Sequence, residues 1–498
     1  MNGTSYASIL EELKPFFYPR SIAVVGVSKN PAGVGTCMVR ALQRFGYKGN
    51  IYPVNPKMSE LLGLKVYPSV SAIPQEVDFA KLYVPTAAAA LIVGECRDKG
   101  IRAVEIFTGG FSEIGMDEGK RLEKELTAQA GNNMRIIGPN CFGVYSPEMG
   151  VTQIPGEKYQ KEKGSFGFLS QSGGLSEDVF RYAVDFGLRF SKGVSYGNAC
   201  DVNEVDLLRY FEADPDTSFV GAYLEGVKNG KEFIDVVRSL ALKKPLILWK
   251  GGLTPSGSRV AASHTGSLAG NENIWSALFK QTNTVSVNGI EELLDTALAF
   301  YHLPPQTDMN VALVCGGGGA GVAFGDSCYR EGLTVAELSK ETQDRIAEHL
   351  APLGTSSHNP IDVGPPFPPG KNLERIMEIL ASSGQVGSII LDKVSPSIRA
   401  REVMGYADQI GWEEKADLDG IPVRIAKEYN LPVIVIMREG GEKRSSLAWE
   451  EERRRLRDYY LENGLGVYQT IDRALRSLGR MIRYYRRKQE ILQEKELP

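Results

Sequence analysis

The sequence of 498 residues has few of the residues that would reveal a function at once. It has four histidines, and its six cysteines (Cys37, Cys96, Cys141, Cys200, Cys315 and Cys328) lack metal-ligand spacing. The 57 basic and 61 acidic residues give a net charge of −4, which excludes bulk attraction to nucleic acid or an anionic membrane. No apolar run approaches the roughly 18 residues of a membrane span, and the N-terminus lacks a signal-peptide pattern. We expect a reduced, cytoplasmic protein with no metal site of its own.

The residues that are present indicate an α/β protein. Hydrophobic residues make up 42% of the chain, charged residues 24%, and there are 54 glycines. This is ordinary globular composition, and the length predicts about three domains. Apolar β-branched runs alternate with glycine-rich turns and amphipathic helical stretches, as in doubly wound folds. We place domains at 1–147, 148–303 and 304–470, followed by a basic helix and tail at 471–498.

The predicted strands fall into three series, one for each domain. The first series is expected within 21–26, 50–55, 78–85, 103–111 and 135–144. The second is expected within 165–174, 189–198, 219–227, 245–252 and 284–289, and the third within 310–315, 387–396 and 431–437. In the terminal helix, Leu475, Leu478, Ile482 and Tyr485 form an apolar stripe between arginines. This stripe favours packing on the protein body, with contact to a partner or a polyanion as the alternative.

The turn after the first predicted strand is typical of a phosphate site. Gly26 lets the backbone approach a ligand closely, and the helix that starts near Gly35 offers free N–H groups and the positive end of its dipole. The spacing is not G-x-G-x-x-G, and no acidic residue follows the second strand, where NAD binders hold the ribose. Lys57 lies there instead, which suits the phosphorylated ribose of NADP or coenzyme A. A turn glycine beside a solvated lysine is the alternative.

A second anion site is predicted at Ser170-Gln171-Ser172-Gly173-Gly174. This segment lies between an apolar strand and a helical stretch, so its glycines expose backbone N–H donors. N-capping alone would also explain the serines. Cys141 closes the last predicted strand of the first domain, where it is either a small core residue or a reactive thiol.

One of the four histidines lies in an unusual setting. His264 is surrounded by small residues in SRVAASHTGSLAG, which is poor core material and lets a loop approach a ligand closely. A neutral imidazole can accept and pass on a phosphoryl group if a carboxylate fixes its tautomer. Glu225, at the end of a predicted strand, is the candidate carboxylate. His302, His349 and His358 are interpreted as structural.

Taken in chain order, these segments resemble the α subunit of NDP-forming acyl-CoA synthetases, a superfamily that includes ADP-forming acetate–CoA ligase and succinyl-CoA synthetase. The motifs are SIAVVGVSKNPAGVG, VNPK, YVP, GPNCFGV, LSQSGGL, YGN, YLEG and SRVAASHTGSLAG. The resemblance implies a CoA-binding Rossmann-like domain followed by two flavodoxin-like doubly wound domains. It implies the reversible conversion of acyl-CoA, phosphate and NDP into carboxylic acid, CoA and NTP through acyl phosphate and phosphohistidine.

The resemblance also assigns roles to individual residues. The implied coenzyme A site is Gly26, Ser28, Asn30, Pro31, Lys57, Val84 and Pro85. The implied phosphate and acyl site is Ser170, Gln171, Ser172, Gly173, Gly174 and Asn198. His264 is implied to carry the phosphoryl group, with Glu225 as its partner. Phosphate is expected to attack the thioester near Asn140 and Cys141, where backbone donors could hold the oxyanion.

The family binds its nucleotide on an ATP-grasp module, for which this chain has no room. We therefore expect a separate β subunit that holds ATP or ADP with Mg²⁺, in a hetero-oligomer with a dimeric core. Two alternatives stay open. An NADP-dependent oxidoreductase would use the first domain but leaves SHTGS unexplained. A non-catalytic CoA-binding regulatory subunit is disfavoured because His264 and Glu225 are retained.

Overall fold

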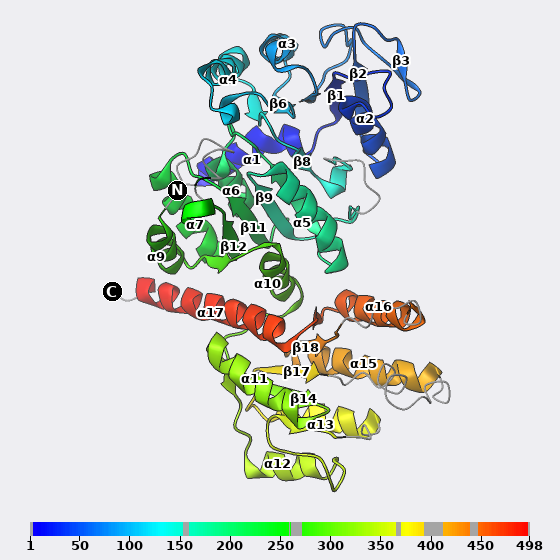
Figure 1. Ribbon diagram of the computed structural model, residues 1–498, viewed down its shortest axis with the longest axis vertical. Coiled ribbons are helices and arrows are strands. Elements are labelled where there is room, and N and C mark those ends of the chain that lie inside the picture. Colours follow the sequence, from blue (N-terminus) through cyan, green and yellow to red (C-terminus); the bar gives the residue numbers. More distant parts are fainter. Residues whose placement is uncertain are drawn as a thin grey trace. The chain divides into compact units, whose positions relative to one another are not determined.

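The computed structural model describes residues 3–152, 159–257, 259, 271–364, 370–392, 412–438 and 447–496 (Figure 1). The chain divides into two compact units, residues 1–293 and 294–498. Within the ranges described, no helix combines the length and apolar character needed to cross a membrane.

The first sheet of the N-terminal unit is parallel, with strand order β2-β1-β5-β6-β7. Its strands are β1 (Ser21–Val25), β2 (Asn50–Val54), β5 (Phe79–Leu82), β6 (Ala103–Ile106) and β7 (Arg135–Ile137), and a small hairpin is formed by β3 (Glu60–Leu61) and β4 (Leu64–Lys65). The helices are α1 (Gly3–Phe17), α2 (Val34–Phe45), α3 (Thr86–Asp98) and α4 (Asp117–Ala130), with 3₁₀ turns at Ser112–Ile114 and Pro147–Met149. The strand order reverses between β1 and β5, and ligands of such sheets bind at the carboxyl ends beside this point.

The second sheet of the same unit has the order β13-β12-β11-β9-β10-β8. Its strands are β8 (Gly143–Tyr145), β9 (Phe166–Ser170), β10 (Phe190–Ser195), β11 (Phe219–Leu224), β12 (Leu246–Lys250) and β13 (Val285–Val287). Its helices are α5 (Gly173–Asp185), α6 (Glu204–Ala213), α7 (Gly230–Lys243) and α9 (Glu272–Thr282), and α10 (Ile290–His302) begins in this unit. The central strands β9, β11 and β12 are apolar and almost wholly buried, as expected of a parallel sheet covered on both faces.

Strand β8 joins the two sheets of this unit. It follows β7 along the chain but pairs antiparallel with β10, with Gly143 opposite Ser195. The sequence predicts this segment as part of the first domain, whereas its hydrogen bonds belong to the second sheet. Because β8 runs against its neighbour, it enters the second sheet at the carboxyl edge. The segment just before it, Gly138 to Phe142, is thereby brought to that edge.

The C-terminal unit contains the third sheet, with order β15-β14-β17-β18-β19 and with β16 also paired to β14. Its strands are β14 (Asn310–Cys315), β15 (Thr334–Val335), β16 (Ile361–Asp362), β17 (Ser388–Asp392), β18 (Val433–Ile436) and β19 (Gly466–Tyr468). Its helices are α11 (Gly318–Glu331), α12 (Lys340–Ala347), α13 (Gly370–Ser382), α15 (Trp412–Tyr429), α16 (Leu447–Glu462) and α17 (Ile471–Glu496). When the antiparallel β8 and the short β16 are left out, all three sheets share one doubly wound strand order, which confirms the predicted α/β fold class.

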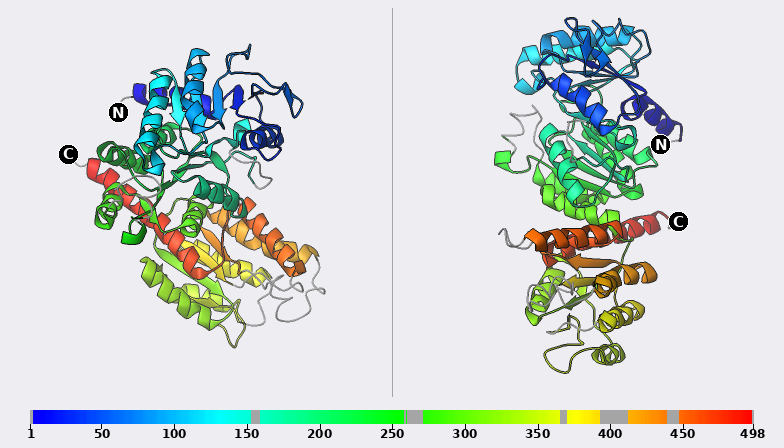
Figure 2. Two further views of the ribbon diagram at one scale, coloured as in Figure 1. Left: turned by 45° about the horizontal axis from the view of Figure 1, so that its top comes forward. Right: turned by 90° about the vertical axis from the view of Figure 1, so that its right-hand side faces the viewer.

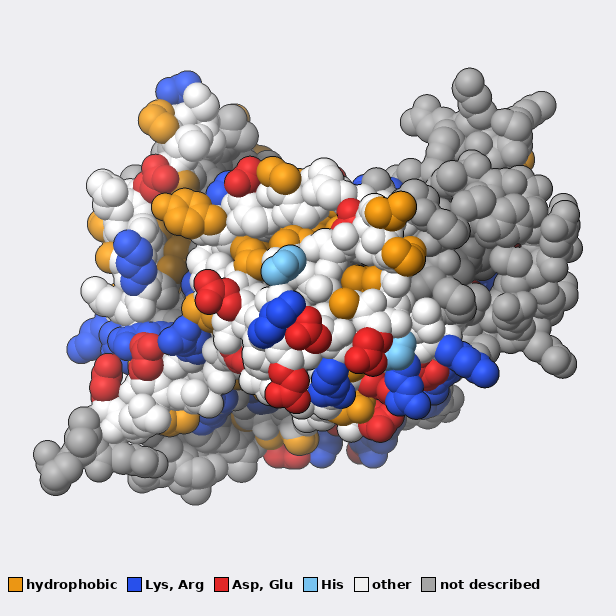
Figure 3. Space-filling model, turned by 90° about the horizontal axis from the view of Figure 1, so that it is seen from below, with side chains coloured by type: hydrophobic (Ala, Val, Ile, Leu, Met, Phe, Trp, Pro, Cys, Tyr) orange, Lys and Arg blue, Asp and Glu red, His pale blue; other side chains and the backbone are white. Residues whose placement is uncertain are grey.

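Helix α17 is the predicted basic terminal helix. It packs against α11 and against β18 and β19 of its own unit (Figures 1 and 2). Leu475, Leu478 and Ile482 are fully buried, so the apolar stripe packs on the body as the sequence favours. On the face shown in Figure 3, acidic and basic side chains lie interspersed.

Candidate functional site

The β1–α2 turn is shaped to receive a ligand at the carboxyl edge of the first sheet. Gly26 has a φ of 95°, and a Cβ there would lie 2.2 Å from the carbonyl oxygen of Tyr83 at the end of β5. Only glycine therefore allows the turn to close against β5. Helix α2 begins after Gly33, which makes no side-chain cap bond, so the N–H groups of the first turn lack acceptors within the helix. This arrangement suits a phosphate or diphosphate group.

The rest of the turn is fixed by its own hydrogen bonds. The side chain of Asn30 accepts from the Ala32 N–H at 3.0 Å, and its carbonyl accepts from the Gly33 N–H at 2.9 Å. Thr36 Oγ1 accepts from the Ser28 N–H at 3.0 Å and donates to the Ser28 carbonyl at 2.7 Å. Asn30 and Pro31 are exposed at the rim of the turn. A ligand would therefore meet a preformed loop.

The other predicted coenzyme A residues lie at the same edge. Asn55, which follows β2, donates to the Val27 carbonyl at 2.5 Å and accepts from the Lys57 N–H at 2.7 Å, so it ties Lys57 to the turn. The Lys57 side chain is exposed. Val84 is 8% exposed, and the exposed Pro85 is the N-cap of α3. The structure thus brings all seven predicted residues to the carboxyl ends of β1, β2 and β5, around the point where the strand order reverses.

The second predicted anion site lies at the start of α5, at the carboxyl edge of the second sheet. Ser172 is the N-cap, and its hydroxyl accepts from the Leu175 N–H at 3.4 Å. Ser170 is buried, and its hydroxyl donates to the Ser172 carbonyl at 2.7 Å, so it builds the turn. The N–H groups of Gly173 and Gly174 point out of the first turn, where they have no acceptor in the helix. These two glycines are the backbone donors that an anion would meet.

Gln171 and Glu225 are connected through the backbone at the ends of β9 and β11. The side-chain oxygen of Gln171 accepts from the N–H groups of Glu225 at 2.8 Å and Gly226 at 3.0 Å. These two bonds fix the amide orientation. The NH₂ group of Gln171 is left to donate to a ligand beside α5. The carboxylate of Glu225 accepts from the Tyr223 hydroxyl at 3.2 Å. Burial, with the charge of Glu225 as a second cause, raises the pKa of that phenol.

The segment that leads into β8 packs directly against this second turn. The ring of Phe142 lies 3.1 Å from where a Cβ of Gly173 would stand, and the Phe142 N–H donates to the Ser195 hydroxyl at 3.2 Å. The Asn140 N–H donates to the Thr108 carbonyl at 3.0 Å. These two N–H groups already have acceptors within the protein. The expectation that backbone donors near Asn140 and Cys141 hold an oxyanion stays a prediction. The side-chain amide of Asn140, 3.4 Å from Asn198 Oδ1, is the polar donor at this position.

Cys141 has the surroundings of a core residue. It is 2% exposed, and its thiol donates to the Ile106 carbonyl at 3.4 Å. Burial, with the charge of Glu105 as a second cause, raises the thiol pKa well above its usual range. A thiol in this environment is not activated as a nucleophile.

Asn198 is held by two carboxylates that the sequence analysis did not identify. Its side-chain nitrogen donates to Glu113 at 2.5 Å and to Glu123 at 3.0 Å. Its backbone N–H donates to the Pro139 carbonyl at 3.0 Å. These contacts fix the amide so that its oxygen faces Asn140. Glu113 lies in the loop after β6, and Glu123 lies in α4. Both are far from Asn198 along the sequence, so no local sequence pattern indicates these hydrogen bonds.

A row of aromatic rings connects the two turns. Tyr83 lies 5.5 Å from Phe107 between ring centroids, and Phe107 stacks on Phe142 at 5.6 Å. Tyr83 belongs to the β5 end that meets Gly26, and Phe142 contacts Gly173. The row therefore runs along the carboxyl edges from the β1–α2 turn to the start of α5. Tyr83 and Phe107 directly follow strands, and Phe142 directly precedes one. The sequence could therefore have indicated that these three aromatic residues lie at strand ends.

His264 lies outside the described residues. The described chain reaches it from β12 through Gly251 and Gly252. Lys250, the last residue of β12, is 5% exposed and donates to the Glu225 carbonyl at 2.8 Å. It also donates to the Gly251 carbonyl. Among the described residues, no group of three or more His, Cys, Asp or Glu is arranged to hold a metal ion.

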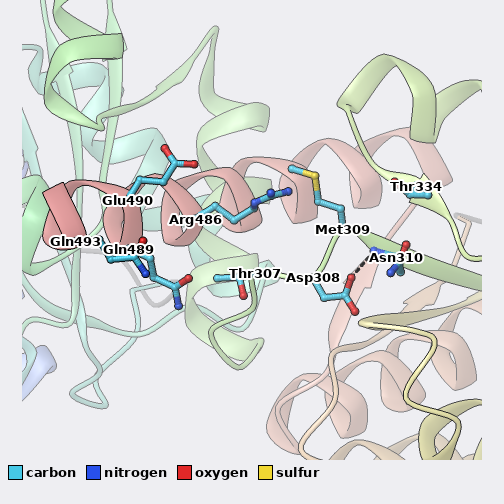
Figure 4. A pocket seen from close by; sticks show the side chains of 9 residues that line it. All are labelled: Thr307, Asp308, Met309, Asn310, Thr334, Arg486, Gln489, Glu490 and Gln493. Carbon is cyan, nitrogen blue, oxygen red and sulfur yellow. Dashed lines mark hydrogen bonds between the residues drawn. The ribbon is translucent and has the colours of Figure 1, made fainter.

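The C-terminal unit has a separate polar cavity of about 550 Å³ (Figure 4). It is lined by Thr307, Asp308, Met309, Asn310, Thr334, Arg486, Gln489, Glu490 and Gln493. The cavity lies at the amino end of β14, and Asp308 accepts there from the Asn310 N–H at 2.9 Å. Its acidic and basic groups are mixed, and no predicted site residue lines it. The Gly316–Gly319 turn of this unit lies at the other end of β14.

Comparison with known proteins places this geometry in a class. Residues 20–147 match the family described as a CoA binding domain, and residues 163–300 match the succinyl-CoA ligase like flavodoxin domain. The α subunit of acetate–CoA ligase [ADP-forming] I from Pyrococcus furiosus is 33% identical over 484 residues, which cover 95% of this chain and 97% of that protein. Acetate–CoA ligase [ADP-forming] from Methanocaldococcus jannaschii is 37% identical over 71% of this chain and 49% of its own length.

A solved structure agrees over the full length. The dinucleotide forming acetyl-coenzyme A synthetase 1 of Candidatus Korarchaeum cryptofilum, in complex with phosphate and ADP, aligns with a TM-score of 0.82 and 30% identity. The alignment covers 98% of this chain and 99% of that one. The chain is thus a CoA-binding ligase subunit of the succinyl-CoA ligase superfamily. It belongs to the family of ADP-forming acetate–CoA ligase α subunits, which confirms the predicted family and replaces the oxidoreductase alternative.

Proposed function

We propose that this chain performs the acyl and phosphoryl transfers of an ADP-forming acyl-CoA synthetase, with coenzyme A at the β1–α2 turn and phosphate at the start of α5. The observation that carries the proposal is the aromatic row from Tyr83 to Phe142, which links the two turns along one edge. A thioester held at the first turn could follow this apolar row to the second. The first turn would then bind the coenzyme A part of the thioester, and the second turn would lie at its acyl end, where phosphate binds.

Coenzyme A fits the first turn by charge and by shape. The uncapped start of α2 would receive the diphosphate, and the exposed Lys57 would pair with the phosphate on the ribose. Val84 and Pro85 would border the adenosine or pantetheine portion. The preformed hydrogen bonds of Ser28 and Asn30 support this site, because a rigid loop loses little entropy when a ligand binds.

The chemistry begins at the start of α5. A phosphate oxygen attacks the thioester carbonyl carbon, the C–S bond breaks, and coenzyme A leaves as its thiolate. Gly173, Gly174 and the Gln171 amide would hold the phosphate, and the Asn140 amide would bond the carbonyl oxygen as it gains charge. The buried Cys141 packs beneath this segment and takes no covalent part.

His264 would then take the phosphoryl group from the acyl phosphate. Its ring nitrogen attacks phosphorus, the bond to the acyl oxygen breaks, and the carboxylate is released. The carboxylate of Glu225, fixed at the end of β11, would bond the other ring nitrogen and stabilise the tautomer needed for attack. The phosphohistidine then delivers the group to a nucleoside diphosphate.

The nucleotide site is proposed to lie on a separate ATP-grasp β subunit, which would also bind Mg²⁺. The Methanocaldococcus relative is about twice as long as the part of it that matches, whereas the Pyrococcus protein is called an α subunit. This difference supports a division into two chains here. We further propose a hetero-oligomer with a dimeric core.

The direct test is labelling of the chain by ³²P-phosphate in the presence of acetyl-CoA without nucleotide. We expect acid-labile, alkali-stable label on the wild type and none on His264→Asn, with coenzyme A binding unchanged in the variant. His349→Asn is the matched control, since it replaces a histidine of the C-terminal unit. Label that persists on His264→Asn would contradict the phosphohistidine.

If the wild type takes up no label, the experiment is repeated with larger acyl-CoA thioesters and with the partner subunit present. Absence of label under all of these conditions, with coenzyme A binding retained, would favour the alternative of a non-catalytic CoA-binding subunit.

A further inference from the structure

Lys250 is a buried cation that the proposed chemistry does not use. It ends β12 opposite Leu224 of β11, and its ammonium lies 5.2 Å from the Trp275 ring centroid of α9. Its hydrogen bonds go to the carbonyl groups of Glu225 and Gly251. Among the described residues, the Lys250 ammonium forms no ion pair with a carboxylate, although the charge of Glu225 acts on it. A charge that is removed from water and hydrogen-bonded only to carbonyl groups is costly, so its position needs a reason.

The two carbonyl groups belong to the two segments that the phosphoryl step needs. Glu225 carries the carboxylate proposed to orient His264, and Gly251 begins the segment that leads to His264. The Glu225 backbone is therefore held on both sides, at its N–H by Gln171 and at its carbonyl by Lys250. A shift at either bond would move the carboxylate relative to the end of β12.

We propose that Lys250 is a positioning residue for phosphoryl transfer, because its ammonium ties the Glu225 strand end to the start of the His264 segment. This inference rests on the proposed function. Lys250 contacts no reacting atom. It fixes the positions of the strand end that carries the Glu225 carboxylate and of the backbone at Gly251, from which the chain leads to His264. Its positive charge also lies at the edge where phosphate is proposed to bind, which lowers the electrostatic cost of a dianion there.

The chain offers a matched control at the opposite end of the same strand. Lys244 precedes β12 and donates to the carbonyl groups of Phe211 at 2.7 Å and Asp214 at 2.5 Å. Lys244 is thus a partly buried lysine that also donates to two carbonyl groups, but it lies at the amino edge of the sheet. Loss of packing and of carbonyl bonds should be similar in Lys244→Met and Lys250→Met. Only the second variant changes the Glu225 edge.

The experiment compares ³²P labelling of the full-length wild type, Lys250→Met, Lys250→Arg and Lys244→Met at several acetyl-CoA concentrations. The acyl-CoA thioester and partner condition are those in which the wild type labels. Thermal unfolding gives the folded fraction of each variant. We expect the maximal labelling rate per folded molecule to fall at least tenfold in Lys250→Met, with the half-saturating acetyl-CoA concentration changed less than twofold. Lys250→Arg should recover part of the rate, because it retains the charge and donors.

The outcomes separate this inference from the function on which it rests. A wild type that never labels overturns both. A wild type that labels while Lys250→Met labels within twofold overturns the role of Lys250 alone, as does an equal loss in Lys244→Met. If Lys250→Met does not fold, Lys250→Arg decides. A folded arginine variant with a lowered maximal rate and an unchanged half-saturating acetyl-CoA concentration supports positioning, and one with wild-type kinetics, or with a loss of coenzyme A affinity alone, overturns it.

Discussion

The two edges of the second sheet use buried charge in opposite ways. At the amino edge, Lys192 is 1% exposed and pairs with Asp214 at 2.9 Å and Asp216 at 3.3 Å. Asp216 also accepts from Lys163 and Tyr18. At the carboxyl edge, Lys250 bonds only carbonyl groups among the described residues. An ion pair whose two charges neutralise each other stabilises the fold. A cation that is hydrogen-bonded to backbone carbonyl groups keeps a positive field that an anionic ligand can use.

The largest effect is expected at the amino edge. Lys192→Met should lower the free energy of unfolding by about 3–5 kcal/mol, because Asp214 would be left buried without its cation. Urea unfolding measures this loss. Labelling per folded molecule should stay at the wild-type level. The double variant Lys192→Met/Asp214→Asn should recover part of the stability, and a double variant no more stable than the single one would contradict the pairing.

The next effect is expected on phosphate binding at the carboxyl edge. Gln171→Glu keeps an oxygen that can accept from the Glu225 and Gly226 N–H groups but replaces the NH₂ donor with a second oxygen. A lost bond to a charged group is worth about 1.5–3 kcal/mol, which corresponds to roughly a 10- to 150-fold weaker phosphate dependence of labelling. Titration with phosphate measures it. Stability close to the wild type together with unchanged phosphate dependence would show that the amide does not face the anion.

A smaller effect is expected from the helix cap. Ser172→Ala removes the acceptor of the Leu175 N–H and should cost about 1 kcal/mol of stability. Asn203→Ala, which removes the cap of α6 at the same edge, is the matched control. Chemical denaturation of both variants gives the two costs. If Ser172→Ala also abolished labelling, the hydroxyl would contact phosphate as well as cap the helix.

A separate effect is expected on the pH dependence of stability. Burial lowers the pKa of Lys250 to about 8, although the charge of Glu225 acts in the opposite direction. An unfolded lysine has a pKa of about 10.4, so between about pH 8 and 10.4 the unfolded chain binds more protons and stability rises with pH. The wild type should therefore gain stability relative to Lys250→Met over this window. Urea unfolding at several pH values measures the difference, and Lys57→Met is the exposed-lysine control. A difference that falls with pH would contradict the burial effect.

The sequence predicts the strands and the two anion turns because both depend on local chemistry. Apolar runs followed by Gly26 or by Ser172-Gly173-Gly174 specify a strand, a turn and a helix start within a dozen residues. The pairing of β8 is not local: three residues, Gly143 to Tyr145, fit either sheet, and tertiary contacts decide. The Glu113 and Glu123 contacts to Asn198 and the carbonyl bonds of Lys250 likewise join distant segments. For Gln171, the ligand role stays a prediction, and the sequence does not indicate that the side-chain oxygen accepts hydrogen bonds from the Glu225 and Gly226 N–H groups.

Strand β8 has a consequence for how this protein can be divided. The strand belongs by chain order to the piece that ends at residue 147 and by hydrogen bonding to the piece that follows. Its Val144 N–H also donates to Glu105 of the first sheet at 2.9 Å. A fragment cut after residue 147 would carry an unpaired strand, and the remaining chain would expose the open edge of β10, a template for pairing with other chains. The two sheets are therefore coupled through β8, and we expect a cut between them to give two fragments that each expose unpaired strand backbone.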